Sequence, residues 1–513
     1  METIFFRRIS CTATMLALLW LFVVHLVPAG TALAEVRHTS MPDITVASAS
    51  GSYKPYFPDI VKTGNGDLVV VYYWSESHVG GNGKIMMKRS TNDGATWSAA
   101  QTVVDTTYDD RDPSIVALSD GTLLVSWFTY SGGPIDVRVI RSADGGATWG
   151  SPVTVGTQMS WAATSSKIVE LSNGDLLIPL YGPASGTGYQ QSTVVRSTDH
   201  GATWPSSTET VMGYSFGSQL VEPAIAELEN GHIRGLIRAS SADNKGYEAN
   251  SYDYGVTWGT LTKLDTKIHA PELFRFPGTD RVFEAWSEFQ HPAGGRPVVA
   301  KIRDLNDPWN GSSSRVLYSN RQTSDMGYSS TVLLDDGRLF TVYYDAQKQL
   351  LGGTYSKPGN WEGDFGAKMD LAGMYASSAI TVTTDMLYTD PNNAATGPKG
   401  ALDGSIAYGS AAFKNATATP ASPATYTIDL QGGHEIIAIG VLLKAGYAET
   451  ADVQLSADGI NWDTVQTYAN VSMNEVDYKY FDCGKTVRFV KVTVTASAGW
   501  AGLNEIQLFE LVP

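Results

Sequence analysis

The sequence has few of the features that mark disulfide-rich, membrane-spanning or nucleic-acid-binding proteins. It contains two cysteines in 513 residues, and Cys11 falls in an N-terminal segment that we expect to be removed. Cys483 then has no partner for an intrachain disulfide, so stability must come from a buried core. A formal net charge of −16 argues against nucleic acid as a partner, because an acidic surface repels phosphates. Beyond the N-terminal segment, no run is apolar enough to span a bilayer.

The first 34 residues have the pattern of a secretory signal. Arg7 and Arg8 precede an apolar run from about Met15 to Val27, and Ala32-Leu33-Ala34 forms a small-residue cleavage site. We therefore expect the protein to be secreted. An uncleaved membrane anchor is the alternative, because the apolar run is long. No residue pattern predicts a cofactor or a metal site.

An eight-residue turn recurs four times in the first half of the chain. The copies are Ser90 to Trp97, Ser142 to Trp149, Ser197 to Trp204 and Ser251 to Trp258. Their closing tryptophans are 52, 55 and 54 residues apart, and weaker copies ending at Trp309 and Trp361 follow after 51 and 52. In each turn an Asp or Asn can bond backbone amides, the Gly tolerates positive φ, and the Trp forms an apolar plug. The spacing predicts six repeated units.

Each unit also begins with two apolar runs joined by a tight turn, such as Asn65-Gly66, Asp120-Gly121 or Asn173-Gly174. Asn-Gly and Asp-Gly between apolar runs are strong β-hairpin signals. Four antiparallel strands in about 52 residues fit a propeller blade, whereas a helical repeat would show a period of 3.6. We predict an all-β protein with a six-bladed β-propeller over residues 43–375, in which ligand sites collect where the innermost strands begin.

From about Thr381 the repeat stops, and alternating apolar and polar residues predict a β-sandwich over residues 381–513. The strand patterns Tyr426 to Leu430, Val487 to Val492 and Leu503 to Phe509 make this segment resemble the discoidin family, the F5/8 type C domains with a galactose-binding fold. Members of that family bind sugars or membranes through loops at one end. A stabilising module without a ligand is the alternative. The stretch Ser456 to Trp462 resembles the repeated turn but is expected to be incidental.

The residues that open the innermost strands include charged and phenolic side chains. In chain order these openings are Tyr56-Phe57-Pro58, Arg111-Asp112-Pro113, Thr164-Ser165-Ser166, Val221-Glu222-Pro223, His269-Ala270-Pro271 and Tyr328-Ser329-Ser330. A ring built only for packing would be apolar or small. We therefore expect the chemistry of the protein at this ring.

The repeated turns, the Asp-Pro-Ser opening of the second unit and the Glu-Pro opening of the fourth make the first 375 residues resemble the sialidase (neuraminidase) superfamily of Asp-box or BNR-repeat propellers. The resemblance implies that Tyr328 is a nucleophile and that Glu222 takes its proton. It also implies that Arg238 and Arg296 hold a carboxylate of the sugar in bidentate fashion.

Two positions depart from the sialidase pattern. The motif that should carry the first arginine reads Pro55-Tyr56-Phe57-Pro58. The loop that should carry the catalytic aspartate offers Glu76 or His78 instead, either of which can act as a general acid or base. Arg111 is a candidate for the third guanidinium. Tyr56 and His269 are further candidates for binding the substrate.

We therefore expect an exo-acting glycoside hydrolase that removes a terminal sugar resembling sialic acid from a glycan, with the second domain attaching it to a polysaccharide or cell surface. One alternative is an exo-arabinanase type of hydrolase, in which Glu222 pairs with Asp112, Asp110 or Glu76. A propeller that binds sugar without turnover is another. The last is a polysaccharide lyase that pairs His78 or His269 with Tyr328.

Overall fold

The computed structural model describes residues 42–510 except 291–294, 312–313, 320–324, 362–366, 390–395, 408–409 and 474–475. The expected signal, residues 1–34 with Cys11, lies outside these residues, as does the side chain of Cys483. The chain divides near residue 365 into two compact units. Within the described part, none of the helices has the length and apolarity needed to cross a bilayer.

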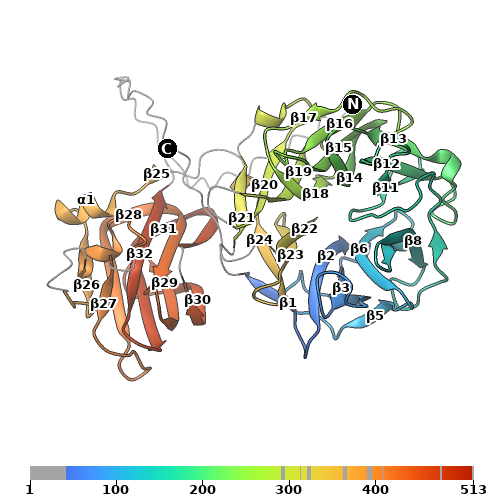
Figure 1. Ribbon diagram of the computed structural model, residues 1–513. Helices are drawn as coiled ribbons and strands as arrows, with labels where there is room; N and C mark the ends of the chain where they lie inside the picture. Colours follow the sequence, from blue (N-terminus) through green and yellow to red (C-terminus); the bar gives the residue numbers. More distant parts are fainter. Residues whose placement is uncertain are drawn as a thin grey trace, which may run out of the picture. The chain divides into compact units, whose positions relative to one another are not determined.

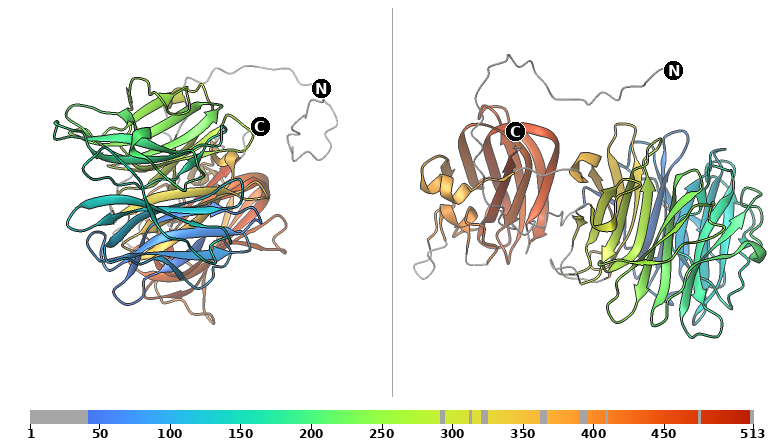
Figure 2. Two further views of the ribbon diagram at one scale, coloured as in Figure 1. Left: turned by 90° about the vertical axis from the view of Figure 1, so that its right-hand side faces the viewer. Right: turned by 90° about the horizontal axis from the view of Figure 1, so that it is seen from above.

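Six antiparallel sheets of four strands make the first unit, and Figure 1 shows them arranged around a common axis. From the inside outward, the first five are β2 (Lys54–Lys62), β3 (Leu68–Ser75), β4 (Lys84–Ser90) and β5 (Gln101–Val104); β6 (Asp109–Ala117), β7 (Leu123–Tyr130), β8 (Pro134–Ser142) and β9 (Val153–Thr154); β10 (Val169–Glu170), β11 (Leu176–Pro183), β12 (Gln190–Ser197) and β13 (Thr210–Gly213); β14 (Gln219–Glu229), β15 (His232–Ser240), β16 (Tyr247–Ser251) and β17 (Thr262–Lys263); β18 (Ile268–Arg275), β19 (Val282–Glu288), β20 (Val298–Arg303) and β21 (Arg315–Tyr318). The predicted six-bladed propeller is confirmed, and the right-hand view of Figure 2 shows its sheets from the side.

The sixth blade closes the ring with a strand from the beginning of the propeller. Its three inner strands are β22 (Met326–Leu333), β23 (Leu339–Asp345) and β24 (Leu350–Ser356), and its outer strand is β1 (Ile44–Ser48). Ile44 lies opposite Gly353 in this pairing. The repeat pattern predicted that each blade draws all four strands from consecutive sequence, and the sixth blade departs from it because β1 occupies the outer edge of β24.

The repeated turns join the third and fourth strands, and each is held by its own side chains. In the second copy, the Ser142 hydroxyl donates to Asp144 Oδ1 at 2.7 Å and accepts from the Gly146 amide at 2.8 Å. The Thr148 amide donates to Asp144 Oδ1 at 2.9 Å. Hydrogen bonds from Thr148 and Ser142 lower the pKa of Asp144 to about 2. The acidic residue therefore stays ionised and fixes the turn at ordinary pH.

Each of these turns also packs on the blade before it. A Cβ added to Gly201 would lie 2.9 Å from Leu124 of the second blade, and one on Gly255 would lie 2.8 Å from Leu177 of the third. Both glycines have positive φ, +80° and +81°. Glycine is thus required twice over, for the backbone conformation and for close approach to the neighbouring sheet.

Apolar side chains fill the spaces between neighbouring sheets. Val71 and Trp127 are fully buried in the cluster of the first and second blades, and Phe340 and Tyr72 are buried in that of the sixth and first. Complete burial of one large apolar side chain contributes about 1.5–3 kcal/mol. The core of the propeller is therefore a ring of layers between the blades.

A buried ion network links the fourth and fifth blades. Arg303 donates to the two carboxylate oxygens of Glu284 at 2.8 and 2.6 Å and to Glu248 at 2.7 Å. Arg234 donates to Glu284 at 3.3 Å. Two arginines and two glutamates balance each other's charge, which makes their burial tolerable. The fifth blade lacks the Ser-Asp turn, and this network joins it to the fourth.

Polar contacts also tie four blades together at the axis. Lys167, just before β10, binds Asp59 of β2 and donates to the carbonyls of Ile60 at 2.7 Å and Ile115 at 3.4 Å. The second oxygen of Asp59 accepts from the Ile115 amide at 2.7 Å, and the Ser330 hydroxyl also donates to this carboxylate. Lys167 and Asp59 line a central cavity. They connect the first, second, third and sixth blades at this cavity.

The second unit is a sheet of eight strands with one short helix, α1 (Leu371–Ala376). Its strands are β25 (Ala367–Lys368), β26 (Thr381–Thr384), β27 (Ala412–Lys414), β28 (Ala424–Leu443), β29 (Ala448–Ser456), β30 (Asp463–Ser472), β31 (Asp477–Ser497) and β32 (Ala501–Glu510). The long strand β28 pairs with β26 through its first half and with β32 through its second. Because β25 pairs with β32, the unit begins before residue 381, where the composition changes. The stretch Ser456 to Trp462 forms a local turn between β29 and β30.

Gly201→Ala should destabilise the propeller because the new Cβ meets Leu124 at a residue with positive φ. Gly174→Ala is the matched control, because Gly174 has φ +88° but no atom within 4 Å of its Cβ position. The clash should cost about 1–3 kcal/mol more than the control. Thermal unfolding of the two variants measures the difference. Equal melting temperatures would show that the turn does not depend on close packing.

Candidate active site

Five of the six innermost strands carry a bulge where they enter the axis. At each bulge one residue that is not glycine has a left-handed backbone: Phe57 (φ 47°), Asp112 (47°), Glu222 (48°), Ala270 (44°) and Tyr328 (50°). The pairing with the second strand shifts register at the same points. Such conformations cost on the order of 1–3 kcal/mol each and are retained where function needs them. The bulges bring the side chains of separate blades to one place.

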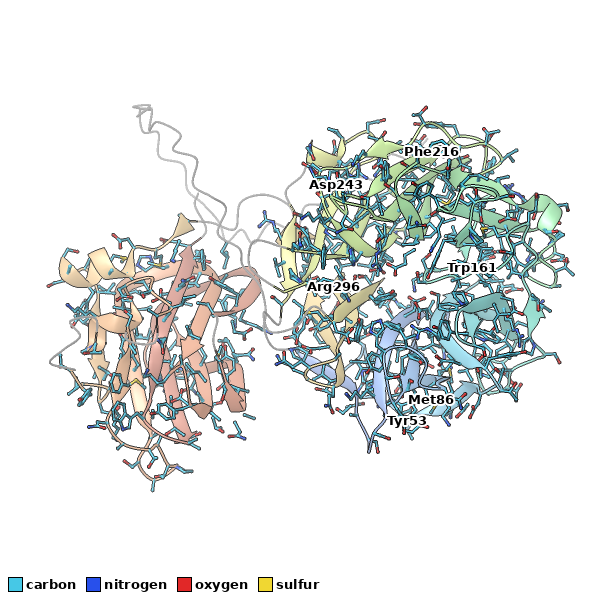
Figure 3. All side chains as sticks on the ribbon, in the orientation of Figure 1. Tyr53, Met86, Trp161, Phe216, Asp243 and Arg296 are labelled. Carbon is cyan, nitrogen blue, oxygen red and sulfur yellow. The ribbon has the colours of Figure 1, made fainter. Side chains whose placement is uncertain are left out.

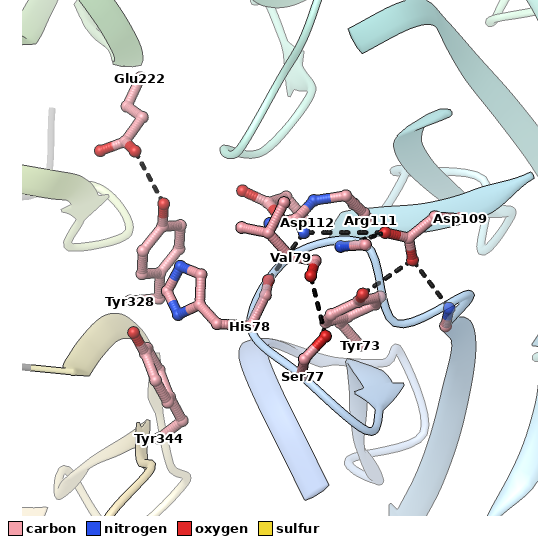
Figure 4. Close-up of polar contacts among 12 residues, drawn as sticks. Tyr73, Ser77, His78, Val79, Asp109, Arg111, Asp112, Glu222, Tyr328 and Tyr344 are labelled. Atoms are coloured by element: carbon pink, nitrogen blue, oxygen red, sulfur yellow. Dashed lines mark hydrogen bonds and ion pairs between the residues drawn. The ribbon is translucent and has the colours of Figure 1, made fainter. Parts of the chain in front are cut away.

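The centre of the site is a hydrogen bond between the fourth and sixth blades. The Tyr328 hydroxyl donates to Glu222 Oε1 at 2.7 Å (Figure 4), and Arg238 Nη1 donates to the same oxygen at 2.6 Å. The Ala270 amide donates to Glu222 Oε2 at 3.0 Å. The structure thus brings together two residues that lie 106 positions apart in the sequence. The phenol has an acceptor for its proton in the resting state.

Glu222 is ionised in this arrangement. Burial alone would raise its pKa, but the charge and hydrogen bond of Arg238, with the hydrogen bond from Tyr328, hold the pKa of Glu222 at about 2. Burial and the nearby Glu222 and Asp112 carboxylates raise the pKa of the Tyr328 phenol well above its usual value. The phenol is therefore protonated beside an ionised Glu222.

Arg111 is committed to groups of the protein. Its guanidinium donates to the carbonyl oxygen of His78 at 2.7 Å and lies 3.5 Å from Asp112 and 3.8 Å from Asp109. Its charged end packs over the rings of four aromatic residues: Phe57, Tyr73, Phe128 and Tyr130. The residue is 5% exposed. The structure does not present Arg111 as a third arginine for a substrate carboxylate.

Asp112 is a buried carboxyl beside the central pair. Burial raises the pKa of Asp112 to about 6, against the lowering effect of Arg111, and the Glu222 charge adds to the rise. A carboxyl with such a pKa can be protonated near pH 6 and can therefore act as an acid.

Asp110, the neighbouring candidate, instead accepts from Trp127 at 2.9 Å and from the Thr106 amide at 2.7 Å inside its blade.

The two candidates from the first-blade loop have different surroundings. His78 Nδ1 lies 2.8 Å from Asp325 Oδ1, and its ring packs against Phe57 at 4.9 Å. Phe57 in turn packs against the Tyr328 ring at 4.7 Å. Glu76 is exposed and accepts from the Ser52 hydroxyl at 2.6 Å. The structure therefore joins His78 to the site and gives Glu76 a separate partner.

Arg296 lies where the fifth and sixth blades meet (Figure 3). It donates through Nε to the Met326 carbonyl at 2.8 Å and through Nη2 to the Tyr344 hydroxyl at 3.1 Å. Tyr344 donates onward to Asp325 at 2.7 Å. Burial, and to a smaller extent the charges of Arg238 and Arg296, lower the pKa of His269.

Tyr56 and His269, the two other candidates for substrate binding, are largely buried. Tyr56 is 3% exposed in a group of rings with Phe57, Tyr73 and Tyr344. It therefore belongs to the wall of the site more than to its surface. His269 is 7% exposed and stacks on Phe289 at 5.0 Å. Burial and the charge of Arg238 lower the pKa of His269 to about 3, so this imidazole is neutral at ordinary pH.

Four residues of the site escaped sequence reasoning. They are Asp109, which accepts from Tyr73 at 2.7 Å and from two loop amides; Asp325 and Tyr344, which face His78; and Tyr181, whose pKa is raised by burial and by Glu222 and Asp112. Asp109 and Asp325 stand close to the openings of innermost strands, and an acidic residue there was the available signal. Within the described ranges, no cluster of three or more His, Cys, Asp or Glu could hold a metal ion.

The family of BNR repeat-like domains matches residues 66–343, and the F5/8 type C domain family matches residues 377–509. A sialidase from Micromonospora viridifaciens is 26% identical over 265 residues, which cover 45% of this chain and 39% of the relative. The chain thus spans about two fifths of the length of that curated relative.

Solved structures with the same fold include proteins of different activities. A protein of unknown function from Dyadobacter fermentans has a TM-score of 0.56 and 20% identity, over 62% of this chain and 98% of that one. A leech intramolecular trans-sialidase scores 0.50 at 13% identity (63% and 71%), and an α-L-arabinanase from Penicillium chrysogenum scores 0.50 at 14% identity (63% and 100%). At these identities the likeness shows the fold. The resemblance to the sialidase superfamily is confirmed by the BNR repeat-like family match and the sialidase relative.

Asp112→Asn should raise the thermal stability of the propeller at pH 7 by on the order of 2–4 °C. The folded-state pKa of Asp112 lies above its ordinary value, so wild type loses stability as the pH rises from about 4 through 6, whereas Asn stays neutral. The gain should vanish below about pH 4, where Asp112 is protonated in both states. Melting temperatures from pH 3 to 8 test this, and a gain that is independent of pH would contradict it.

Proposed function

The chain belongs to the family of BNR repeat-like domains, and we propose that its propeller is an exo-acting glycoside hydrolase that removes a terminal acidic sugar from a glycan. The observation that carries the proposal is the 2.7 Å hydrogen bond from the Tyr328 hydroxyl to an ionised Glu222. A phenol is a weak nucleophile unless a neighbouring base takes its proton. Glu222 is placed to do so.

A sugar with a carboxylate at the reacting carbon suits this pair. An anionic nucleophile would be repelled by such a substrate, whereas a neutral phenol would not. Arg238 and Arg296 are the arginines proposed to hold the carboxylate, because both remain partly exposed whereas the Arg111 side chain is only 6% exposed. When a substrate carboxylate binds Arg238, that arginine holds Glu222 less tightly, and Glu222 becomes a better base as the phenol attacks.

Secretion and attachment complete the proposal. The signal pattern of residues 1–34 leads us to propose an extracellular enzyme. The F5/8 type C domain, matched over residues 377–509, would bind a glycan of the same polymer or cell surface. Attachment of this kind raises the effective concentration of substrate at the propeller without any new contact in the active site.

A second candidate is hydrolysis of a neutral terminal sugar, such as arabinose, by two carboxyl groups. The observation in its favour is Asp112, a buried carboxyl with a pKa of about 6 in the same site as an ionised Glu222. A carboxyl kept protonated beside an ionised one is the arrangement of acid and nucleophile in many glycosidases. Tyr328 would then only orient Glu222.

Tyr328→Phe should reduce kcat on the preferred acidic glycoside by about 10³-fold or more, because the ring remains but the attacking oxygen is lost. Release of sugar from a panel of acidic and neutral terminal glycosides measures this. The control for loss of a phenol is Tyr72→Phe, at a buried tyrosine of the first blade. If Tyr328→Phe keeps its rate on a neutral glycoside while Asp112→Asn loses it, the second candidate is correct. If wild type binds glycans but releases no sugar, both hydrolase proposals fail.

Arg238→Ala should raise KM for an acidic glycoside by at least about tenfold, because a charged hydrogen bond to the substrate contributes about 1.5–3 kcal/mol. Tyr56→Phe should change KM less than about twofold, because Tyr56 lies in the wall with 3% of its surface exposed. Steady-state kinetics on the same substrate compare the two. Equal changes would contradict the carboxylate clamp.

A further inference from the structure

His78 and Asp325 form a pair that joins the first and sixth blades. His78 belongs to the loop between β3 and β4, and Asp325 immediately precedes β22. His78 Nδ1 lies 2.8 Å from Asp325 Oδ1, and the Tyr344 hydroxyl donates to the same oxygen at 2.7 Å. Burial alone would raise the pKa of Asp325, but the hydrogen bond and charge of His78 lower it. Asp325 is therefore an anion that faces the imidazole.

This contact sets the tautomer of His78. An ionised carboxylate only accepts hydrogen bonds, so Nδ1 must carry a proton whether the imidazole is neutral or charged. Nε2, on the other side of the ring, is left as the nitrogen that can gain or lose a proton.

The ring of His78 is held beside the reacting groups. It packs edge-on against Phe57, with centroids 4.9 Å apart and planes at 82°, and Phe57 packs on Tyr328 at 4.7 Å. Figure 4 draws His78 and Tyr328 among the labelled residues of the site. The charge of His78 also acts on Asp112. Phe57 thus contacts both rings and links the imidazole of His78 to the phenol of Tyr328.

We propose that His78 is the proton-transfer residue of this site and that Asp325 is a positioning residue that fixes its tautomer and orientation. The inference rests on the proposed function. As the Tyr328 oxygen bonds to the anomeric carbon and its proton passes to Glu222, the bond to the leaving oxygen breaks and His78 Nε2 protonates that oxygen. Water then attacks the same carbon and gives a proton to the neutral His78, while the bond to Tyr328 breaks and the phenolate regains its proton from Glu222. Both steps balance, and the enzyme returns to its starting state.

The same contacts couple proton transfer to substrate binding. Arg296, assigned above to the substrate carboxylate, donates to the Tyr344 hydroxyl at 3.1 Å, and Tyr344 donates to Asp325. A chain of hydrogen bonds therefore runs from the arginine to the histidine across the fifth, sixth and first blades. A merely structural pair would hold the loop in place without affecting leaving-group chemistry.

The test compares Asp325→Asn with wild type on two substrates of the same sugar, one with an activated aryl leaving group and one with a sugar leaving group. Protonation matters for the sugar leaving group and little for the activated one. Asp325→Asn should lose at least about tenfold more kcat on the sugar leaving group than on the aryl one. The pH at which kcat declines on the alkaline side should also move lower, because loss of the anion releases the proton of the acid more easily.

Asp336→Asn is the control, because Asp336 lies in the β22–β23 hairpin of the same blade and pairs with Arg338. It should leave both substrates and the pH profile unchanged. Nitrogen NMR of the histidine rings, with His78 assigned by a His78→Gln variant, should show a proton on Nδ1 in wild type. Equal losses on both substrates with an unchanged pH profile, or a wild-type proton on Nε2 alone, overturn the inference. Inactivity of wild type on every glycoside overturns the proposed function instead.

Discussion

The site depends on a steric constraint, the left-handed bulge at the start of the innermost strands. A regular strand would alternate its side chains between the two neighbouring blades. The bulges at Asp112, Glu222 and Tyr328 break that alternation and direct one side chain from each strand to the axis. The strained backbone is held by the apolar side chains packed between the blades and by the polar contacts of Lys167 and Asp59 at the axis. The packing of the ring therefore holds a strained backbone at these positions.

Charges in the site are paired before any ligand arrives. Arg238 with Glu222, Arg111 with Asp109 and Asp112, and Asp325 with His78 all lie within 4 Å. Among the buried pairs, removing the single partner of a charge is usually more costly than the pair is worth. Arg111 has two carboxylate partners, so loss of the Asp112 charge leaves it paired with Asp109. The two arginines differ in their surroundings, because Arg111 packs among the aromatic rings of the wall while Arg238 donates to the Glu222 oxygen that also accepts from Tyr328.

The repeated motifs made the six-bladed architecture predictable from the sequence. The features that depart from the repeat could not be predicted. The turns ending at Trp97 to Trp258 and the Asn-Gly hairpins are local signals, so six blades followed from spacing alone. Glu222 and Tyr328 were placed together because both open an innermost strand. The pairing of β1 with β24, the Arg303 network and the partner of His78 depend on contacts between distant segments, for which a single sequence carries no local signal. Arg111 is a further example. The sequence predicted that it opens an innermost strand, but not that its guanidinium would pair with Asp112 and pack over four aromatic rings.

Closure of the ring by β1 has a consequence for how the chain is made. Ile44 and its partner Gly353 are 309 positions apart, so β1, which is synthesised before the other strands of the propeller, can pair only after nearly all of them have been made. Closing so long a loop costs only a little more entropy than closing a shorter one. Until then the outer edge of β24 is an open template for another chain. Nascent copies crowded on one messenger are thus exposed to exchange of this strand between neighbours.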